Sequence, residues 1–148
     1  MSERGDKGRE YFKSGLNCAQ ATLVALADLS GLDEETAKKV ASGFGGGIGR
    51  MREVCGTVSG AVMAMGMILG DKIGKAELYA KIQQFADKFR SENGSIICRE
   101  LLGLNKGEDA CGAPSPRTEQ YYKKRPCAEL VKYAVELLEE SLKAEKIL

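Results

Sequence analysis

The feature that most constrains the fold of this 148-residue chain is the helical period of its apolar residues. Between residues 75 and 92, apolar side chains recur every three or four positions and form one face, as in an amphipathic helix: Leu78, Ile82, Phe85 and Phe89. No run of β-branched residues alternates with a period of two. The sequence therefore predicts an all-α fold, a compact bundle of about five to seven helices.

Start and stop signals place these helices along the chain. Asn17 can cap a helix that starts at Cys18 and ends near Leu29, with Gln20 completing a capping box and Gly31 beyond the end. Further helices are expected at about 33–43, 55–69, 75–92, 95–102 and 126–143.

The segment 103–125 is the exception to this helical pattern. It contains two of the three prolines and Cys111, and it is expected to hold at most a short helix near 116–124. A connection of this length is usually functional or disordered. No repeat or dividing linker is visible, so residues 1–148 are expected to form a single domain.

Histidine is absent from the chain, and this restricts the available chemistry. Ser-His and Cys-His nucleophile pairs, two-His metal sites and the usual general base near neutral pH are all excluded. Carboxylates, lysines and five cysteines remain. The residues best suited to covalent or metal chemistry are therefore Cys18, Cys55, Cys98, Cys111 and Cys127.

Charge and composition bear on location and partners. The 22 basic and 21 acidic residues are spread along the chain, which indicates neither a nucleic-acid footprint nor a polybasic membrane surface. The N-terminal stretch is charged, and the uncharged run 54–70 is short and glycine-rich for a membrane span. We expect a cytoplasmic protein with reduced thiols, no nucleic-acid partner and no membrane segment.

A glycine-rich stretch, SGFGGGIGRMREVCGTVSG, surrounds Cys55. Its spacing matches neither the dinucleotide fingerprint nor the phosphate loop, although its backbone amides leave anion binding open as an alternative. Gly56, Gly60 and Ala64 lie four residues apart, so one helix face is smooth enough for a neighbouring backbone to approach closely. We expect this arrangement to place Cys55 deep in the bundle, with packing alone as the other explanation for the glycines.

Four cysteines fall at predicted helix starts: Cys18, Cys55, Cys98 and Cys127. A helix N-terminus favours the thiolate, and Arg52, Arg99 and Arg125 lie close in sequence to three of these cysteines. Successive cysteines are 37, 43, 13 and 16 positions apart, without the short paired spacing of zinc ribbons and ferredoxins. The cysteines could still converge at one end of a bundle, or could simply pack as small apolar residues.

These motifs resemble the C_GCAxxG_C_C family of small prokaryotic proteins, described as redox-active, over nearly the whole chain. The family carries a C-G-A-x-x-G motif, which here reads CGTVSG: Cys55, Gly56 and Gly60 match, and Thr57 replaces the alanine. The other family cysteines map to LNCAQ (Cys18), IICRELLG (Cys98) and RPCAEL (Cys127), with Cys111 outside the pattern. The resemblance implies a prosthetic group such as an iron–sulfur cluster, held by these four cysteines beside Gly56 and Gly60. It also implies neighbouring oxidoreductases or transporters as partners.

Three functions remain open from the sequence. In the first, Cys18, Cys55, Cys98 and Cys127 converge and bind an iron–sulfur cluster or another thiolate-bound metal. In the second, the chain is a metal-free thiol–disulfide enzyme or sensor, with Cys111 as one partner. In the third, it is a helical interaction protein, such as a homodimer, whose cysteines are structural.

Overall fold

A computed structural model describes residues 2–104, 117–118 and 126–148. These residues contain eight α-helices and no strand, apart from one isolated bridge between Val54 and Ile97, so the predicted all-α class is confirmed with slightly more helices than expected. The elements are α1 (Glu3–Lys13), α2 (Cys18–Ala25), α3 (Ala27–Ser30), α4 (Glu34–Ala41), the 3-10 turn η1 (Ser42–Phe44), α5 (Gly56–Leu69), α6 (Lys75–Asn93), α7 (Cys98–Leu101) and α9 (Cys127–Ala144).

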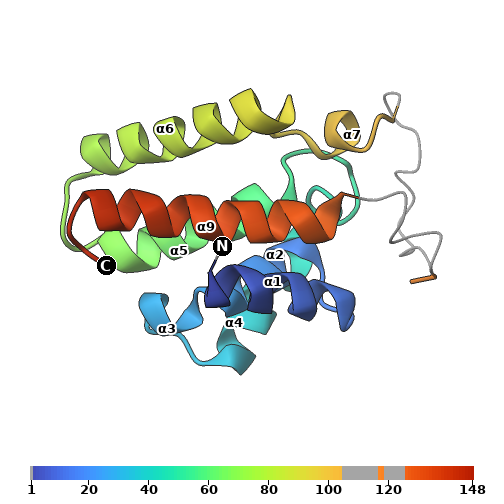
Figure 1. Cartoon of the computed structure of the whole chain (residues 1–148), viewed down its shortest axis with the longest axis horizontal. Helices are drawn as coiled ribbons and strands as arrows, with labels where there is room; N and C mark the ends of the chain where they lie inside the picture. Colours follow the sequence, from blue (N-terminus) through green and yellow to red (C-terminus); the bar gives the residue numbers. More distant parts are fainter. Residues whose placement is uncertain (1, 105–116, 119–125) are drawn as a thin grey trace.

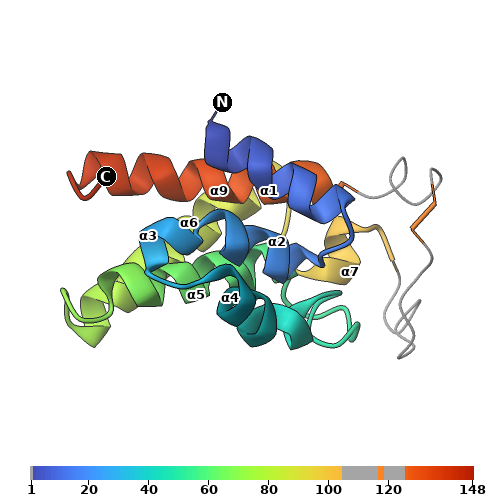
Figure 2. The ribbon, with the colours of Figure 1, turned by 90° about the horizontal axis from the view of Figure 1, so that it is seen from below.

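Helix α2 forms the centre of the bundle. It packs against α1, α4, α5 and α9, and seven of its eight residues are buried. A helix that is apolar on every side must be covered on every side, which explains this position. Figure 1 shows α5, α6 and α9 along the long axis of the molecule, with α1 to α4 gathered on one side of α9. Figure 2 shows the same arrangement from below.

The predicted capping box at the start of α2 is present. The Asn17 side chain accepts a hydrogen bond from the Gln20 amide, and the Gln20 side chain accepts one from the Asn17 amide, at 2.9 and 3.0 Å. This reciprocal pair satisfies two amides that no helical carbonyl can reach. It therefore fixes Cys18 as the first helical residue.

Two helix predictions need correction. The helix expected over residues 18–29 is interrupted at Leu26, so that α2 and the short α3 follow one another before Gly31, which has φ +71°. Helix α1, which the sequence analysis did not predict, forms before the first predicted helix, capped by the side chain of Ser2. The short helix expected near 116–124 lies almost wholly outside the described residues.

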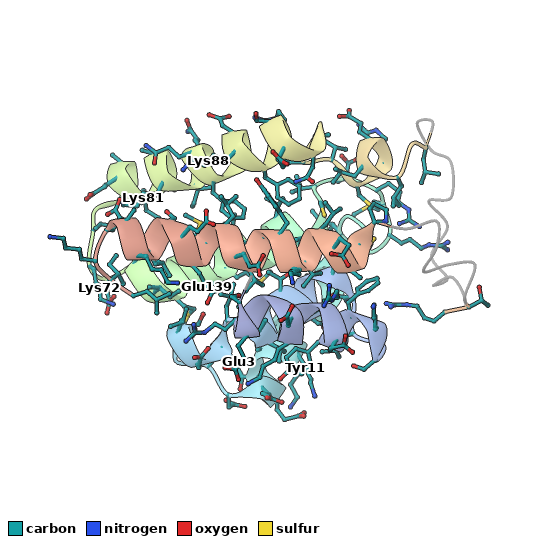
Figure 3. The ribbon with its side chains drawn as sticks, viewed as in Figure 1. Glu3, Tyr11, Lys72, Lys81, Lys88 and Glu139 are labelled. Carbon is teal, nitrogen blue, oxygen red and sulfur yellow. The ribbon has the colours of Figure 1, made fainter. Side chains whose placement is uncertain are left out.

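Helix α1 is fastened to α9 by polar contacts as well as by its apolar face. Arg4 forms an ion pair with Glu139 at 2.9 Å, and the Ser2 hydroxyl donates to the same carboxylate. Glu139 is buried, and Figure 3 shows it on α9. Buried charges require such partners. None of the described helices has the length and apolar character needed to cross a membrane.

Candidate functional site

A cavity of about 260 Å³ lies where α2, α5, α7 and α9 begin. Cysteines, glycines and arginines dominate its wall. In Figure 3, sulfur atoms are visible at the end of the bundle where α7 lies and α9 starts. The cavity lining includes Phe12, Asn17, Cys18, Gly45, Gly46, Gly47, Gly49, Arg50, Arg52, Cys55, Gly56, Cys98, Arg117 and Cys127.

All four cysteines that the sequence singled out line this cavity, and we call them the four cavity cysteines: Cys18, Cys55, Cys98 and Cys127. Three are the first residues of α2, α7 and α9, while Cys55 is the N-cap of α5. Cys18, Cys55 and Cys98 are buried, and Cys127 is partly buried. None of the four forms a disulfide. Cys111 lies outside the described residues.

Two of the four cavity cysteines are in contact with each other. The Cys18 and Cys127 thiols are hydrogen-bonded to each other. Cys55 and Cys98 flank the bridge between Val54 and Ile97: the Cys55 amide donates to Ile96 O at 2.8 Å, and the Cys98 amide donates to Glu53 O at 2.6 Å. Cys55 and Cys98 are therefore diagonal across the bridge, since Cys55 is opposite Ile96 and Cys98 is opposite Glu53. Among the other thiols, Cys127 raises the pKa of Cys55 more than Cys98 does.

The glycine loop before Cys55 is wound tightly on itself. The amides of residues 48 to 53 each donate to a carbonyl within residues 43–48. Five consecutive residues, 46–50, have positive φ values between 53° and 73°. Those six amides bond within the loop and are therefore not free to bind an anion. Ile48 at φ +65° is particularly costly for a β-branched residue, and such strain concentrates at functional sites.

Two glycines allow the cavity wall to close around the cysteines. A Cβ on Gly47 would lie 2.7 Å from Cys98 Cβ and 2.6 Å from the Glu53 amide nitrogen. A Cβ on Gly56 would lie 2.9 Å from Phe44 O and 3.2 Å from Cys18 Cβ. Both positions therefore hold a cysteine-bearing segment at a distance that only glycine permits.

The sequence analysis also named Gly60 as a residue beside the cofactor, and the structure places it against α2. It is not among the described cavity-lining residues, and it faces α2, where an added Cβ would lie 2.8 Å from Ala19 O. Gly56 does line the cavity. The two glycines together let α5 approach the backbone of α2, as the spacing of small residues suggested.

Arginines supply positive charge to the cavity. Arg50, Arg52 and Arg117 line it, and its described lining includes no aspartate or glutamate. The buried Arg52 donates from Nη1 to Cys98 Sγ at 3.6 Å. This concentration of cations favours an anionic occupant in a low-dielectric space.

The neighbours expected to activate individual cysteines are placed differently. Arg52 was expected to act on its sequence neighbour Cys55. It donates to the sulfur of Cys98, which is 46 positions away. Arg99 is directed to the Glu53 carboxylate at 3.5 Å and to the Arg52 carbonyl. Arg125 lies outside the described residues.

Burial opposes the expected thiolate character of two cysteines. The hydrogen bond from Cys127, followed by burial, raises the pKa of the Cys18 thiol well above its ordinary value. Burial raises the pKa of the Cys55 thiol to about 11, against a lowering contribution from the Thr57 hydroxyl. The helix N-termini therefore do not lower the pKa of these two thiols, because desolvation and neighbouring thiols have the larger effect.

Sequence reasoning did not identify two further residues of the cavity wall. The Arg117 guanidinium lies 4.4 Å from the centre of the Phe12 ring and donates to the carbonyls of Phe12 and Leu16 at 3.0 and 3.2 Å. These contacts bring a residue from the long segment 103–125 onto the C-terminal end of α1. No motif marks either residue, since their meeting depends on tertiary structure.

The donor chemistry of the cavity fits a soft metal. Four thiols with no histidine or carboxylate among the described lining residues are the donors preferred by zinc and iron–sulfur centres. Across the described chain, however, no three His, Cys, Asp or Glu side chains are already grouped as ligands for one metal ion. In the metal-free structure the four thiols line one space, and two of them, Cys18 and Cys127, are in contact.

Comparison with known proteins gives a family match that spans the four cavity cysteines. The family model described as "Putative redox-active protein (C_GCAxxG_C_C)" matches residues 16–141, a segment that includes all four cavity cysteines. A curated relative from Archaeoglobus fulgidus, described only as an uncharacterized protein, is 30% identical over 141 residues, which cover 93% of this chain and 91% of the relative. No solved structure matches the chain.

Proposed function

The chain belongs to the C_GCAxxG_C_C family, described as redox-active, and from this premise we propose that its four cavity cysteines hold an iron–sulfur or other thiolate-bound metal centre. The observation that carries the proposal is the shared cavity: thiols from the starts of four helices line one space of about 260 Å³. When bound, such a centre would supply one-electron transfer if it contains iron, or a structural thiolate site if it contains zinc.

Metal binding in this cavity requires the thiols to move closer together, because no three His, Cys, Asp or Glu side chains of the described residues are grouped around one point. What supports the proposal is the cavity that the four thiols share and the contact between Cys18 and Cys127.

The remaining cavity residues provide the surroundings that such a centre needs. Thiolates carry negative charge, and Arg50, Arg52 and Arg117 place positive charge around them. Arg52 also orients Cys98 through its 3.6 Å contact with the sulfur. Because Cys18 and Cys55 bind their protons tightly, metal binding must release protons from both thiols.

The proposal is tested by purifying the protein without oxygen and recording its visible spectrum together with its iron, zinc and sulfide content. The expected result is bound iron and sulfide in stoichiometric amounts, with the broad absorbance of thiolate-ligated iron at about 400 nm. Purified metal-free protein should regain metal on anaerobic incubation with iron and sulfide, or with Co²⁺ as a probe of thiolate ligation. Protein that takes up none of these metals would contradict the proposal.

Single Cys→Ser variants assign the ligands. Substitution of any of the four cavity cysteines is expected to remove most of the bound metal, because a hard hydroxyl replaces a soft thiolate. Cys111→Ser is the matched control, since it removes a thiol outside the family motif, and it should retain the wild-type metal content. Equal metal loss in Cys111→Ser would show that the ligand set is wrong.

The contact between Cys18 and Cys127 favours a second candidate function, metal-free thiol–disulfide exchange. In this reaction the two thiols would give two electrons and two protons to a substrate disulfide, forming a Cys18–Cys127 disulfide and two substrate thiols. The raised pKa of Cys18 counts against it, because the thiolate is the attacking species. Loss of two free thiols on mild oxidation of metal-free protein, prevented in Cys127→Ser, would support it.

The predictions about cellular context come from the sequence and its family. An oxidoreductase or a transporter-associated protein as partner, a homodimeric state and a cytoplasmic location all stay predictions from the sequence and its family. A reducing compartment would suit the proposed centre, because the cysteines must be free to bind metal.

A further inference from the structure

The capping box at the start of α2 consists of two side-chain amides, those of Asn17 and Gln20. The usual box pairs a serine or threonine with a glutamate or glutamine. The oxygens of the two amides accept from the backbone amides of Gln20 and Asn17, at 2.9 and 3.0 Å. Each side chain also carries an NH₂ group, which capping of α2 does not use.

Both of these NH₂ groups donate to the C-terminal end of α4. Asn17 Nδ2 donates to Ser42 O at 3.1 Å, and Gln20 Nε2 donates to Lys38 O at 3.0 Å. Lys38 is one of the last four residues of α4, whose carbonyls cannot all be satisfied within the helix. The residues that cap the start of α2 therefore also hold the end of α4.

The end of α4 leads through η1 into the glycine loop, which contacts both sides of the cavity. A Cβ on Gly45 would lie 2.5 Å from Asn17 Cγ, so the loop backbone packs directly on the residue that precedes Cys18. A Cβ on Gly47 would lie 2.7 Å from Cys98 Cβ. Asn17 itself lines the cavity. The loop thus lies between the segments that carry two of the proposed ligands.

We propose that Asn17 and Gln20 are positioning residues: by holding the end of α4 they fix the glycine loop, and the loop sets the separation of Cys18 and Cys98. This inference rests on the proposed function and names the residues that preorganise its ligands. Segments that are already held in place lose less conformational freedom when a ligand binds between them, so the affinity is higher.

The test is the double variant Asn17→Ser/Gln20→Glu, which installs the ordinary capping box. Both capping acceptors are kept, and both donors to α4 are removed. Asp33→Ser is the matched control: Asp33 is the exposed N-cap of α4, accepts from the Thr36 amide, and is not among the described residues that line the cavity.

Three measurements are made on each protein. Titration of Co²⁺ into the metal-free protein against a competing chelator gives the affinity. The ligand-field bands of the cobalt-saturated protein report the coordination geometry, which a loss of stability alone would not change. Urea unfolding of the metal-free protein measures its stability.

The double variant is expected to fold, to lose about tenfold in Co²⁺ affinity and to show shifted or weaker ligand-field bands. Asp33→Ser should keep the wild-type affinity and bands. Asn17→Ser alone should show a smaller change in the same direction, and it supplies the comparison if the double variant does not fold.

Wild-type affinity in the substituted protein would overturn the role of Asn17 and Gln20. A lower affinity with unchanged bands, or an equal loss in Asp33→Ser, would also overturn it, because weaker helix capping would then explain the effect. A wild type that does not bind Co²⁺ would overturn the proposed function together with this inference.

Discussion

At the scale of single residues, two effects compete at Cys55, which caps α5 with its side chain in the cavity. The N-terminus of a helix favours the thiolate, but burial removes water from it, and the pKa of this thiol rises to about 11. Metal coordination reverses this balance, because it replaces the proton with a cation. Burial thus makes the metal-free cysteine inert while leaving it available as a ligand.

This raised pKa predicts how the stability of the reduced, metal-free protein depends on pH. The unfolded chain loses the Cys55 proton near the ordinary pKa of 9.0, and the folded chain loses it only near 11. The contribution is therefore fully present below pH 9 and is lost as pH rises towards 11. The loss is about 2–3 kcal/mol as an upper order of magnitude.

Urea unfolding at pH 8, 9, 10 and 11 measures this effect, with Cys55→Ala as the variant that cannot titrate. The wild type should lose more stability than Cys55→Ala between pH 9 and 11, whatever lysines and tyrosines contribute to both proteins. Two parallel curves would show that Cys55 does not bind its proton more tightly in the folded state.

At the scale of elements, glycines decide how closely the segments around the cavity approach. Gly47 and Gly49 belong to the same left-handed loop, with φ values of +73° and +53°. A Cβ on Gly47 would meet Cys98 and the backbone of residues 52 and 53, whereas a Cβ on Gly49 would meet nothing within 4 Å. The loop therefore contains its own matched pair of positions.

Gly47→Ala is expected to destabilise the protein by about 2–4 kcal/mol and to lower metal retention, because strain and overpacking combine at Cys98. Gly49→Ala should cost only about 1–2 kcal/mol, from the left-handed backbone alone, and should retain metal. Urea unfolding and metal analysis of both variants make the comparison. Equal metal content in the two variants would show that the loop does not determine the position of Cys98.

Helix α5 contains a second matched pair of glycines. A Cβ on Gly60 would lie 2.8 Å from Ala19 O and 3.0 Å from Thr22 Cβ, while a Cβ on Gly66 would meet nothing within 4 Å. Gly60→Ala should destabilise by about 1–3 kcal/mol through displacement of α2. Gly66→Ala should stabilise by about 0.5–1 kcal/mol, since alanine is the better helix former.

Urea unfolding would measure both changes, with the slope of the unfolding free energy against urea concentration unchanged from the wild type. If Gly60→Ala were as stable as Gly66→Ala, close packing of α2 on α5 would not explain the small-residue spacing.

Local signals predicted elements where the determining interactions are local. The capping box of Asn17 and Gln20 and the left-handed Gly31 appear as expected at helix ends. The break at Leu26 was missed, and no glycine or proline stands there to signal it. Helix α1 was missed because its charged sequence gains its position from contacts with α9, such as Arg4 with Glu139.

At the scale of the whole molecule, the cavity exists because four helices begin at one end of the bundle. The sequence predicted the helix starts, but the intervals of 37, 43 and 29 positions between the four cysteines at those starts say nothing about their distances in space. Convergence depends on how the intervening helices pack, and that information is spread over the entire core. The same reason explains why Arg117 and Phe12 could not be assigned to the cavity, and why the contact of Arg52 with Cys98 was not expected.

The most direct test of the central claim is the first coordination shell of the bound metal. X-ray absorption at the metal edge of the anaerobically loaded protein should show sulfur neighbours alone, because thiols are the soft donors among the described residues that line the cavity. The Cys18→Ser variant should either lose the metal or show a new oxygen neighbour. A wild-type shell of nitrogen or oxygen atoms would contradict an all-thiolate centre held by the four cavity cysteines.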